Sequence, residues 1–267
     1  KLKLSVSAGV AVSGGNEADA ELLIRIADAA MHQAKAQGRD GYVIGSESAS
    51  DPARLRLELE GDLRAAVERE ELAVYYQPQL DTQSGQVVGV EALLRWRHPE
   101  RGFVPPAEFV PLLEETGLIV EVGEWVLRTA CDDVQRWFRD GGTRVRLAVN
   151  LSPRQLLVPN LGEVVRGILD ETGLPPELLE LELTETAAAL NLDSVLGVLR
   201  ELQALGVMTV IDDFGVGESW LVRLSDFPVR TLKVDRYFIA GITSPGNALA
   251  IVEAVIALGH ALGLLVI

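Results

Sequence analysis

Apolar and polar positions follow two different arrangements along the chain, one before about residue 50 and one after it. Residues 4–12 and 41–45 have the composition of short strands, and residues 18–38 between them have apolar positions at helical spacing. This pattern predicts a strand–helix–strand segment over residues 1–48. The polar stretch SESASDPAR, which contains Pro52, predicts a linker over residues 49–58. A longer α/β unit is expected over residues 59–267.

Strand-like and helix-like runs alternate from about residue 72 onward. The turn signal DTQSG separates the first two strand runs, which predicts that they pair antiparallel. The later alternation favours a parallel sheet of the TIM-like (β/α)8 barrel type. The expected strands are residues 72–80, 86–96, 144–151, 178–184, 207–212, 231–235 and 264–267. Because a closed barrel of this type has about eight strands, we expect a barrel that is incomplete at its C-terminal end.

Composition and charge narrow the classes of function. The chain has 267 residues, 48% of them hydrophobic, which is enough to bury a large core. The formal charge of -15 opposes binding to a nucleic acid polymer, because such binding depends on Lys and Arg replacing counterions. The single cysteine, Cys131, excludes a disulfide framework and favours a packing role in a reducing compartment, which we take to be the cytoplasm.

No part of the chain has the pattern of a targeting or membrane segment. The first residues lack the charged, apolar and small-residue order of a signal peptide. The most apolar stretch, residues 249–267, is interrupted by Glu253, His260 and two glycines. It therefore predicts a buried helix followed by a strand rather than a bilayer span.

Polar side chains stand where several of the apolar runs end. Glu91, Asn150, Glu182 and Asp212 come from four different predicted strands. A solvated strand end is the plainer interpretation of any one of them, but Glu91 lies in an otherwise apolar strand, where a carboxylate needs a partner. Because the carboxyl ends of barrel strands meet at one mouth, we expect the four to converge there. Oxygen ligands in that number favour a hard divalent cation.

Three further residues fit chemistry on a phosphate ester. Asp213 follows Asp212 directly, and adjacent carboxylates can serve two metal ions that clamp a phosphoryl group. Lys233 can orient a water molecule or stabilise developing charge, although a surface lysine is the alternative. Arg95 lies four residues after Glu91, hence on the same side of the strand, where its guanidinium can hold a phosphate oxygen.

Five motifs occur in an order that resembles one known family. They are EALLRW, NLS, ELTET, DDFGVG and LKVDRYF, and from about residue 55 to the end the chain resembles the EAL family of bacterial cyclic di-GMP phosphodiesterases. The segment SVSAGVAV and the later ADAAMHQAKAQGRDGYVIG look like the C-terminal end of a GGDEF diguanylate cyclase domain. The resemblance implies a hydrolase that converts cyclic di-GMP to linear pGpG in bacterial second-messenger signalling.

The resemblance also assigns roles to individual residues. It implies a two-metal site for Mg2+ or Mn2+ with the ligands Glu91, Asn150, Glu182, Asp212 and Asp213. Catalytic roles fall to Glu91, Asp213 and Lys233, the last of these contacting the nucleophilic water. Substrate contacts are implied for Gln77, Leu94, Arg95 and Asp235. Glu185 is implied to brace the loop after Asp213, a loop that the family also uses in dimer contacts, so a homodimer is an expected assembly.

The chain departs from the family pattern in two places. The loop reads DDFGVGESWL where the family has close to DDFGTGYSSL, so Val216, Glu218 and Trp220 are expected to change loop packing or dimerisation. In the family, a glutamate-bearing segment and an eighth strand with a substrate-contacting glutamine follow the seventh strand. Neither lies before Ile267, so we expect this fragment to be inactive or severely impaired.

Two other classes of function fit part of the pattern. One is a regulatory module that binds cyclic di-GMP without cutting it. The other is an unrelated metal-dependent barrel, such as an enolase-like lyase with Lys233 as the base. The lyase does not explain Asn150, the paired aspartates or the order of the motifs.

Overall fold

The computed structural model describes residues 6–12, 20–36, 41–45, 50–189, 192–215, 227–242 and 247–267, and these form two compact units. The first unit, Lys1–Arg69, contains strand β1 (Ser7–Ala11), helix α1 (Ala20–Ala36), strand β2 (Gly41–Gly45) and helix α2 (Ser50–Glu68). β1 and β2 pair in parallel, which confirms the predicted strand–helix–strand segment.

The predicted linker is not an irregular segment. Residues 50–58 form the first half of α2, and the division between the two units falls between Arg69 and Glu70. Pro52 gave a misleading signal, because it lies in the first helical turn, where a missing backbone N–H leaves no intrahelical hydrogen bond unmade.

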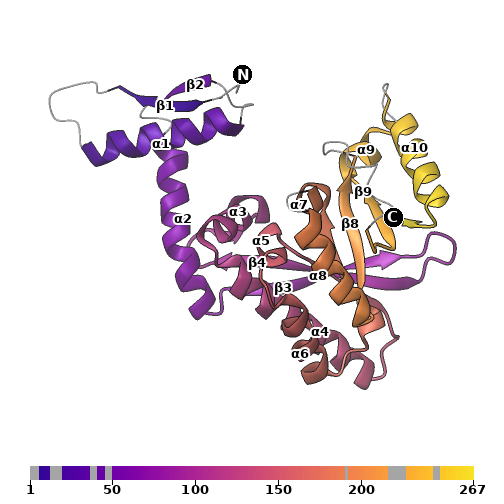
Figure 1. The fold of residues 1–267 in the computed structure, drawn as a ribbon. Coiled ribbons are helices and arrows are strands. Elements are labelled where there is room, and N and C mark those ends of the chain that lie inside the picture. The colour runs from indigo at the N-terminus through magenta and orange to yellow at the C-terminus, as the bar shows by residue number, and fades with distance from the viewer. Residues whose placement is uncertain are drawn as a thin grey trace. The chain divides into compact units, whose positions relative to one another are not determined.

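The second unit, Glu70–Ile267, is built on one mixed sheet (Figure 1). Its strands are β3 (Leu72–Leu80), β4 (Val87–His98), β5 (Gly102–Val104), β6 (Arg146–Asn150), β7 (Leu179–Thr184), β8 (Met208–Phe214), β9 (Thr231–Val234) and β10 (Leu265–Val266). They lie in the order β10-β9-β8-β7-β6-β4-β3, with β5 beside β4. All seven predicted strands are present, and β3 and β4 pair antiparallel as predicted. β5 was not predicted, because three residues are too few to show a period.

Barrel closure is not part of the observed pairing. The strands from β4 through β6 to β10 are parallel, as predicted, but within the described ranges no pairing joins β3 to β10. The fold is therefore an α/β unit with a mixed sheet, and complete TIM-like closure remains a prediction.

Helices connect the strands of this sheet. They are α3 (Pro106–Thr116), α4 (Ile119–Arg139), α5 (Pro153–Leu156), α6 (Leu161–Thr172), α7 (Glu185–Ala189), α8 (Leu192–Ala204), α9 (Arg236–Gly241) and α10 (Ala248–Ala261), with a 3-10 turn at Pro176–Leu178. α5 and α6 are separate helices, because Pro159 disfavours helical backbone at the residue before it. α10 followed by β10 confirms the order predicted for residues 249–267, but the helix is not buried as predicted, because Leu249, Ile251 and Ile256 are 36–48% exposed. None of the helices in the described ranges has both the length and the apolarity of a membrane span.

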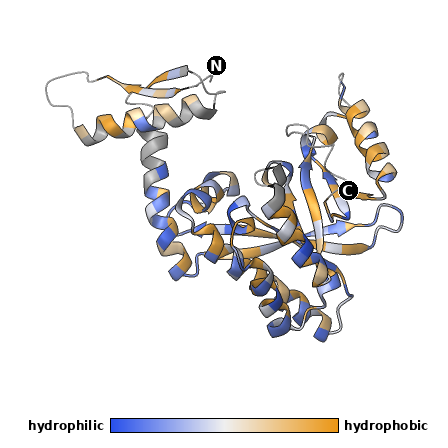
Figure 2. Cartoon of the chain, in the orientation of Figure 1, coloured by the Kyte–Doolittle hydropathy of each residue, from blue (hydrophilic) through white to orange (hydrophobic). Residues whose placement is uncertain are grey.

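The core lies between the parallel strands and a layer of helices. α4, α6 and α8 pack beside one another and contact β6 and β8 (Figure 1), and apolar residues mark the strands and much of the helices (Figure 2). The contributing side chains are Val126, Ala130 and Val134 of α4, Val165 and Ile168 of α6, Leu199 and Leu202 of α8, and Leu147, Leu181 and Ile211 of the strands, all buried. Cys131 of α4 is fully buried, and this burial raises the pKa of its thiol to about 12. It is therefore a packing residue, as predicted.

Candidate active site

Strand register places the predicted ligands on one face of the sheet, which we call the site face. Asn150 of β6 lies opposite Glu182 of β7, and Thr184 of β7 lies opposite Asp212 of β8. Glu91 of β4 lies opposite Ala148, two residues before Asn150. Because side chains two positions apart on a strand share a face, all four predicted ligands point to the same side.

Three carboxylates from three strands meet on this face. Glu91, Glu182 and Asp212 each offer an oxygen, and these oxygens lie within 4.8 Å of one another. The Asn150 amide nitrogen donates a hydrogen bond of 2.9 Å to Glu91 Oε1. The structure thus brings together the four residues expected to converge, and their role as metal ligands remains a prediction.

Lys233 enters the centre of the three carboxylates, which we call the carboxylate cluster. Its Nζ donates to Glu182 Oε2 at 2.6 Å, to Glu91 Oε2 at 3.2 Å and to Asp212 Oδ2 at 3.3 Å. The side chain is only 14% exposed, so it is not a surface lysine. Burial lowers its pKa, but the three carboxylates together outweigh burial and raise the pKa above its ordinary value. Lys233 is therefore protonated at neutral pH.

Glu182 is the most deeply buried member of the cluster. Its side chain is 1% exposed, and its Oε1 accepts no hydrogen bond from the described residues. Burial raises the pKa of Glu182 to about 7, with Lys233 opposing this shift and Glu91 adding to it. A buried oxygen without a donor, beside carboxylate and amide oxygens, is a donor set that suits a hard divalent cation.

The paired aspartates owe their arrangement to an irregularity in the sheet. The β8–β9 register shifts between Ile211 and Phe214, and Asp213 has a left-handed backbone with φ of 54°. In a regular strand, Asp212 and Asp213 would point to opposite faces, whereas a bulge re-aims a side chain. Asp213 is not one of the three carboxylates of the cluster. Its pKa is raised by burial and by the charges of Asp212 and Asp235.

Asp235 and Glu185 each accept a backbone hydrogen bond near this bulge, Asp235 at the start of α9 and Glu185 at Gly215. Asp235 caps α9, where its Oδ1 accepts from the Tyr237 backbone N–H at 2.6 Å. Glu185 is buried, and its Oε2 accepts from the Gly215 N–H at 3.1 Å. Glu185 therefore holds the backbone two residues after Asp213, the position expected of a brace. The substituted loop positions Val216, Glu218 and Trp220 lie outside the described residues.

Three of the four predicted substrate contacts lie along β3 and β4, whereas Asp235 precedes α9. Gln77 is exposed and lies opposite Glu91, so it shares the site face. Arg95 also shares this face, and its Nη1 donates to the Leu94 carbonyl at 2.9 Å. Leu94 itself lies on the opposite face from Glu91, whereas Leu93, which was not predicted, shares the face of Glu91. The two-residue period of the strand is the signal that could have identified Leu93.

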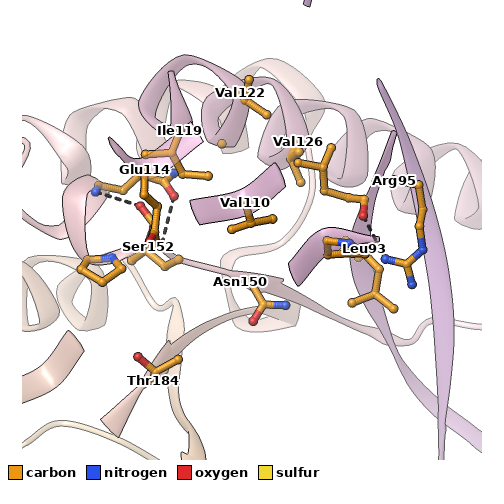
Figure 3. A pocket seen from close by; sticks show the side chains of 17 residues that line it. Leu93, Arg95, Val110, Glu114, Ile119, Val122, Val126, Asn150, Ser152 and Thr184 are labelled. Carbon is orange, nitrogen blue, oxygen red and sulfur yellow. Dashed lines mark hydrogen bonds between the residues drawn. The ribbon is translucent and has the colours of Figure 1, made fainter. Parts of the chain in front are cut away.

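A cavity of about 280 Å³ lies between β4 and β6 on one side and α3, α4 and α5 on the other (Figure 3), and the three cluster carboxylates are not among its lining residues. Asn150 and Thr184 line it on the strand side, and Ile119 and Val122 line it from α4 (Figure 3). Both Leu93 and Leu94 contribute to its wall. Glu114 of α3 lines it too, and burial raises the pKa of this carboxyl. Glu114 was missed, because nothing distinguishes it from other glutamates near helix ends.

The family model of the EAL domain matches residues 60–267, most of the chain and all of the site. The chain belongs to the EAL domain family. The bifunctional diguanylate cyclase/cyclic di-GMP phosphodiesterase MucR of Pseudomonas aeruginosa is 42% identical over 267 residues, which are 100% of this chain and 39% of that protein. The cyclic di-GMP phosphodiesterase PdeR of Escherichia coli is 36% identical over 263 residues, which are 98% of this chain and 40% of that protein.

Solved structures of EAL proteins share the fold of this EAL domain. A structure described as the PaMucR phosphodiesterase in complex with c-di-GMP superposes with a TM-score of 0.75 at 44% identity, covering 78% of this chain and 85% of that one. The FimX EAL domain of Pseudomonas aeruginosa bound to c-di-GMP gives a TM-score of 0.70 at 25% identity, covering 78% of this chain and 84% of that one. The curated relatives are longer, since the chain spans about 39% of MucR.

Proposed function

We propose that this EAL domain hydrolyses one phosphodiester bond of cyclic di-GMP and releases linear pGpG in bacterial second-messenger signalling. The observation that carries the proposal is the convergence of Glu91, Asn150, Glu182 and Asp212 with Lys233 on one face of the sheet. It is supported by the phosphodiesterase names of MucR and PdeR and by the c-di-GMP complex of a relative at 44% identity.

The reaction proposed here uses divalent cations, Mg2+ or Mn2+. Glu91, Asn150, Glu182 and Asp212 would hold one of them, and Asp212 with Asp213 the second. Such a cation neutralises phosphate charge and lowers the pKa of a bound water towards neutrality. The buried Glu182 oxygen that accepts no hydrogen bond supports this assignment. So does the net charge of -15, because an anionic substrate needs local positive charge in an acidic protein.

The remaining residues would bind and orient the dinucleotide. Arg95 presents a guanidinium on the site face, where it would hold a phosphate oxygen. Gln77 lies opposite Glu91 and would contact a base edge, and Leu93 and Leu94 offer apolar contact through the wall of the cavity. Asp235 would hold the substrate beside Asp213. Lys233 would direct an N–H at the attacking water and stabilise charge as the phosphodiester bond breaks.

Three assignments concern the protein around the site. We propose that the first unit is the C-terminal end of a GGDEF domain, because the bifunctional MucR matches all of this chain, the first unit included. We propose a homodimer through the segment after Asp213, which Glu185 anchors at Gly215. A cytoplasmic location is proposed because the substrate is an intracellular messenger and the single cysteine needs no oxidising compartment.

The test is a product assay on a full-length version of the protein with cyclic di-GMP and Mn2+, read by chromatography of the nucleotides, with calorimetry of cyclic di-GMP binding on the same sample. Linear pGpG is the expected product, and it should disappear on chelation. Binding of cyclic di-GMP without any product would instead establish the binding module. If the sample shows no binding and no product, both the hydrolase and the binding module are excluded.

A further inference from the structure

Lys233 uses all of its hydrogen-bonding capacity on the carboxylate cluster. An ammonium group has three N–H donors, and the Lys233 Nζ has three carboxylate partners at 2.6, 3.2 and 3.3 Å. Each partner comes from a different strand, so this one side chain holds β4, β7 and β8 together at the site. No donor is left over for a water molecule in this arrangement.

The carboxylate cluster carries more negative charge than Lys233 alone can balance, so the contact with Lys233 matters for its stability. Glu91, Glu182 and Asp212 carry three negative charges when ionised, and their exposed fractions are only 18%, 1% and 19%. Lys233 supplies one positive charge at their centre. Carboxylates this close together repel one another strongly where water is scarce, so the ammonium acts as their counter-ion.

A divalent cation would have to use the same oxygens. Glu182 Oε2, Glu91 Oε2 and Asp212 Oδ2 each accept from Lys233, while Glu182 Oε1 accepts no hydrogen bond from the residues that the structure describes. Two cations that share one set of oxygens also repel each other. Resting on the proposed function, we propose that Lys233 alternates between two exclusive roles: counter-ion that competes with the metal, and, once a cation takes over its carboxylates, donor to the reacting groups.

If Lys233 competes with the metal, replacing this lysine should tighten metal binding. The Lys233→Met variant keeps the length of the side chain and removes the charge. We expect its Kd for Mn2+, measured by calorimetry, to fall at least about tenfold relative to the unsubstituted chain, because one repulsive charge at the site is gone. In EDTA its Tm should fall, because three buried carboxylates lose their counter-ion, and Mn2+ should raise its Tm by more than it raises that of the unsubstituted chain.

Strand β7 provides a matched control. Glu180 lies two residues before Glu182 on the same face, is also 1% exposed, and pairs with Arg146 at 2.8 Å. Arg146→Met therefore removes a cation from an equally buried glutamate away from the cluster. It should lower the Tm in EDTA while leaving the Kd for Mn2+ unchanged. Lys233→Gln, which keeps N–H donors without the charge, should also tighten Mn2+ binding. It replaces Lys233→Met as the test variant if Lys233→Met is insoluble.

The outcomes separate this inference from the proposed function. Equal or weaker Mn2+ binding by both Lys233 variants, beside normal binding by the unsubstituted chain, would overturn the competition and leave the metal-dependent reaction standing. Tighter binding by Arg146→Met as well would also overturn it, because the gain would then follow from lost stability and not from lost charge at the cluster. Absence of Mn2+ binding in every protein would remove the proposed metal site and this inference together.

Discussion

At the scale of single residues, the site is defined by charge in places where water is scarce. Glu182 is almost fully buried. Its Oε2 accepts from Lys233, and its Oε1 accepts no hydrogen bond within the described part of the chain. Glu91 is held from both sides, by the Asn150 amide and by Lys233. Each side chain is therefore fixed by the others, and loss of one changes the geometry of the rest.

Loss of a cluster carboxylate should abolish turnover. Glu91→Ala and Asp212→Ala each remove one of the three converging oxygens, and we expect hydrolysis of cyclic di-GMP to fall at least about 100-fold in a full-length version of the protein. Glu163→Ala, an exposed acidic position on α6, serves as the control and should keep full activity. Retained hydrolysis in either cluster variant would exclude the mechanism.

Asp213 offers a test in which stability and activity move in opposite directions. Its left-handed backbone, with φ of 54°, is less favourable for an L-residue than for glycine, although aspartate is among the residues that adopt it most readily. Asp213→Gly should raise the free energy of unfolding by about 0.5–1 kcal/mol in urea titrations and should sharply reduce turnover. Glu70→Gly relieves a similar φ of 56° in an exposed turn, so it should give the same gain with no loss of turnover. A destabilised Asp213→Gly would show that the backbone is not strained.

At the scale of elements, the site depends on how strands end and helices begin. β6 delivers Asn150 and is followed within three residues by α5, whose start is fixed by a capping box between Ser152 and Gln155. Gln155 Oε1 accepts from the Ser152 N–H at 3.0 Å, and Ser152 Oγ accepts from the Gln155 N–H at 3.3 Å. Gly123 of α4 allows this approach, because a Cβ there would lie 2.2 Å from Gln155 Nε2.

Breaking this capping box should loosen the metal site. Gln155→Ala leaves the Ser152 N–H without its acceptor, so we expect a loss of about 1–2 kcal/mol in stability and a higher Mn2+ concentration for half-maximal activity. Asp81→Ala removes comparable turn contacts, to Ser84, in the exposed β3–β4 loop. It should lower stability without changing the Mn2+ requirement. An unchanged Mn2+ requirement in Gln155→Ala would mean that Asn150 is positioned without α5.

The elements also show where sequence reasoning succeeds and where it fails. Apolar runs located seven of the eight strands of the sheet, because each of these strands packs at least one face against the core. Convergence of Asn150, Glu182 and Asp212 followed from their place near strand ends, whereas Glu91 lies inside β4 and meets them through the register of β4 and β6. The first turns of α2 were missed because SESASDPAR has the composition of a loop, and Pro52 is tolerated near a helix start.

Two finer features of the site, the Asp213 backbone and the Lys233 contacts, could not be predicted from the sequence. The left-handed conformation of Asp213 depends on the β8–β9 register shift, which arises from pairing between distant segments. The three contacts of Lys233 depend on side-chain direction at three strands at once. Period alone places Lys233 on the correct face, but it does not show that one ammonium group meets three carboxylates.

At the scale of the whole second unit, the two faces of the sheet have different roles: one packs against helices and the other carries the candidate site. Helices α4, α6 and α8 cover one face and supply most of the apolar packing, whereas the site face carries the carboxylates, Lys233 and Arg95. A substitution on the helical side should therefore act through stability, and one on the site face through binding and turnover. Sequence could predict this division, because residues 179, 181 and 183 of β7 are leucines while residues 180 and 182 are glutamates.

The reactivity of Cys131 can report how often the helical layer separates from the sheet. The chain has this one thiol, it is fully buried on α4, and its pKa is raised to about 12, so an alkylating reagent meets neither an accessible nor an ionised sulfur. Iodoacetamide at pH 8 should label native protein at least about a thousandfold more slowly than urea-unfolded protein, measured by intact mass. Rapid labelling of native protein would reveal local detachment of α4. Otherwise the ratio of the two rates would report, without an introduced cysteine, how seldom this layer separates from the sheet.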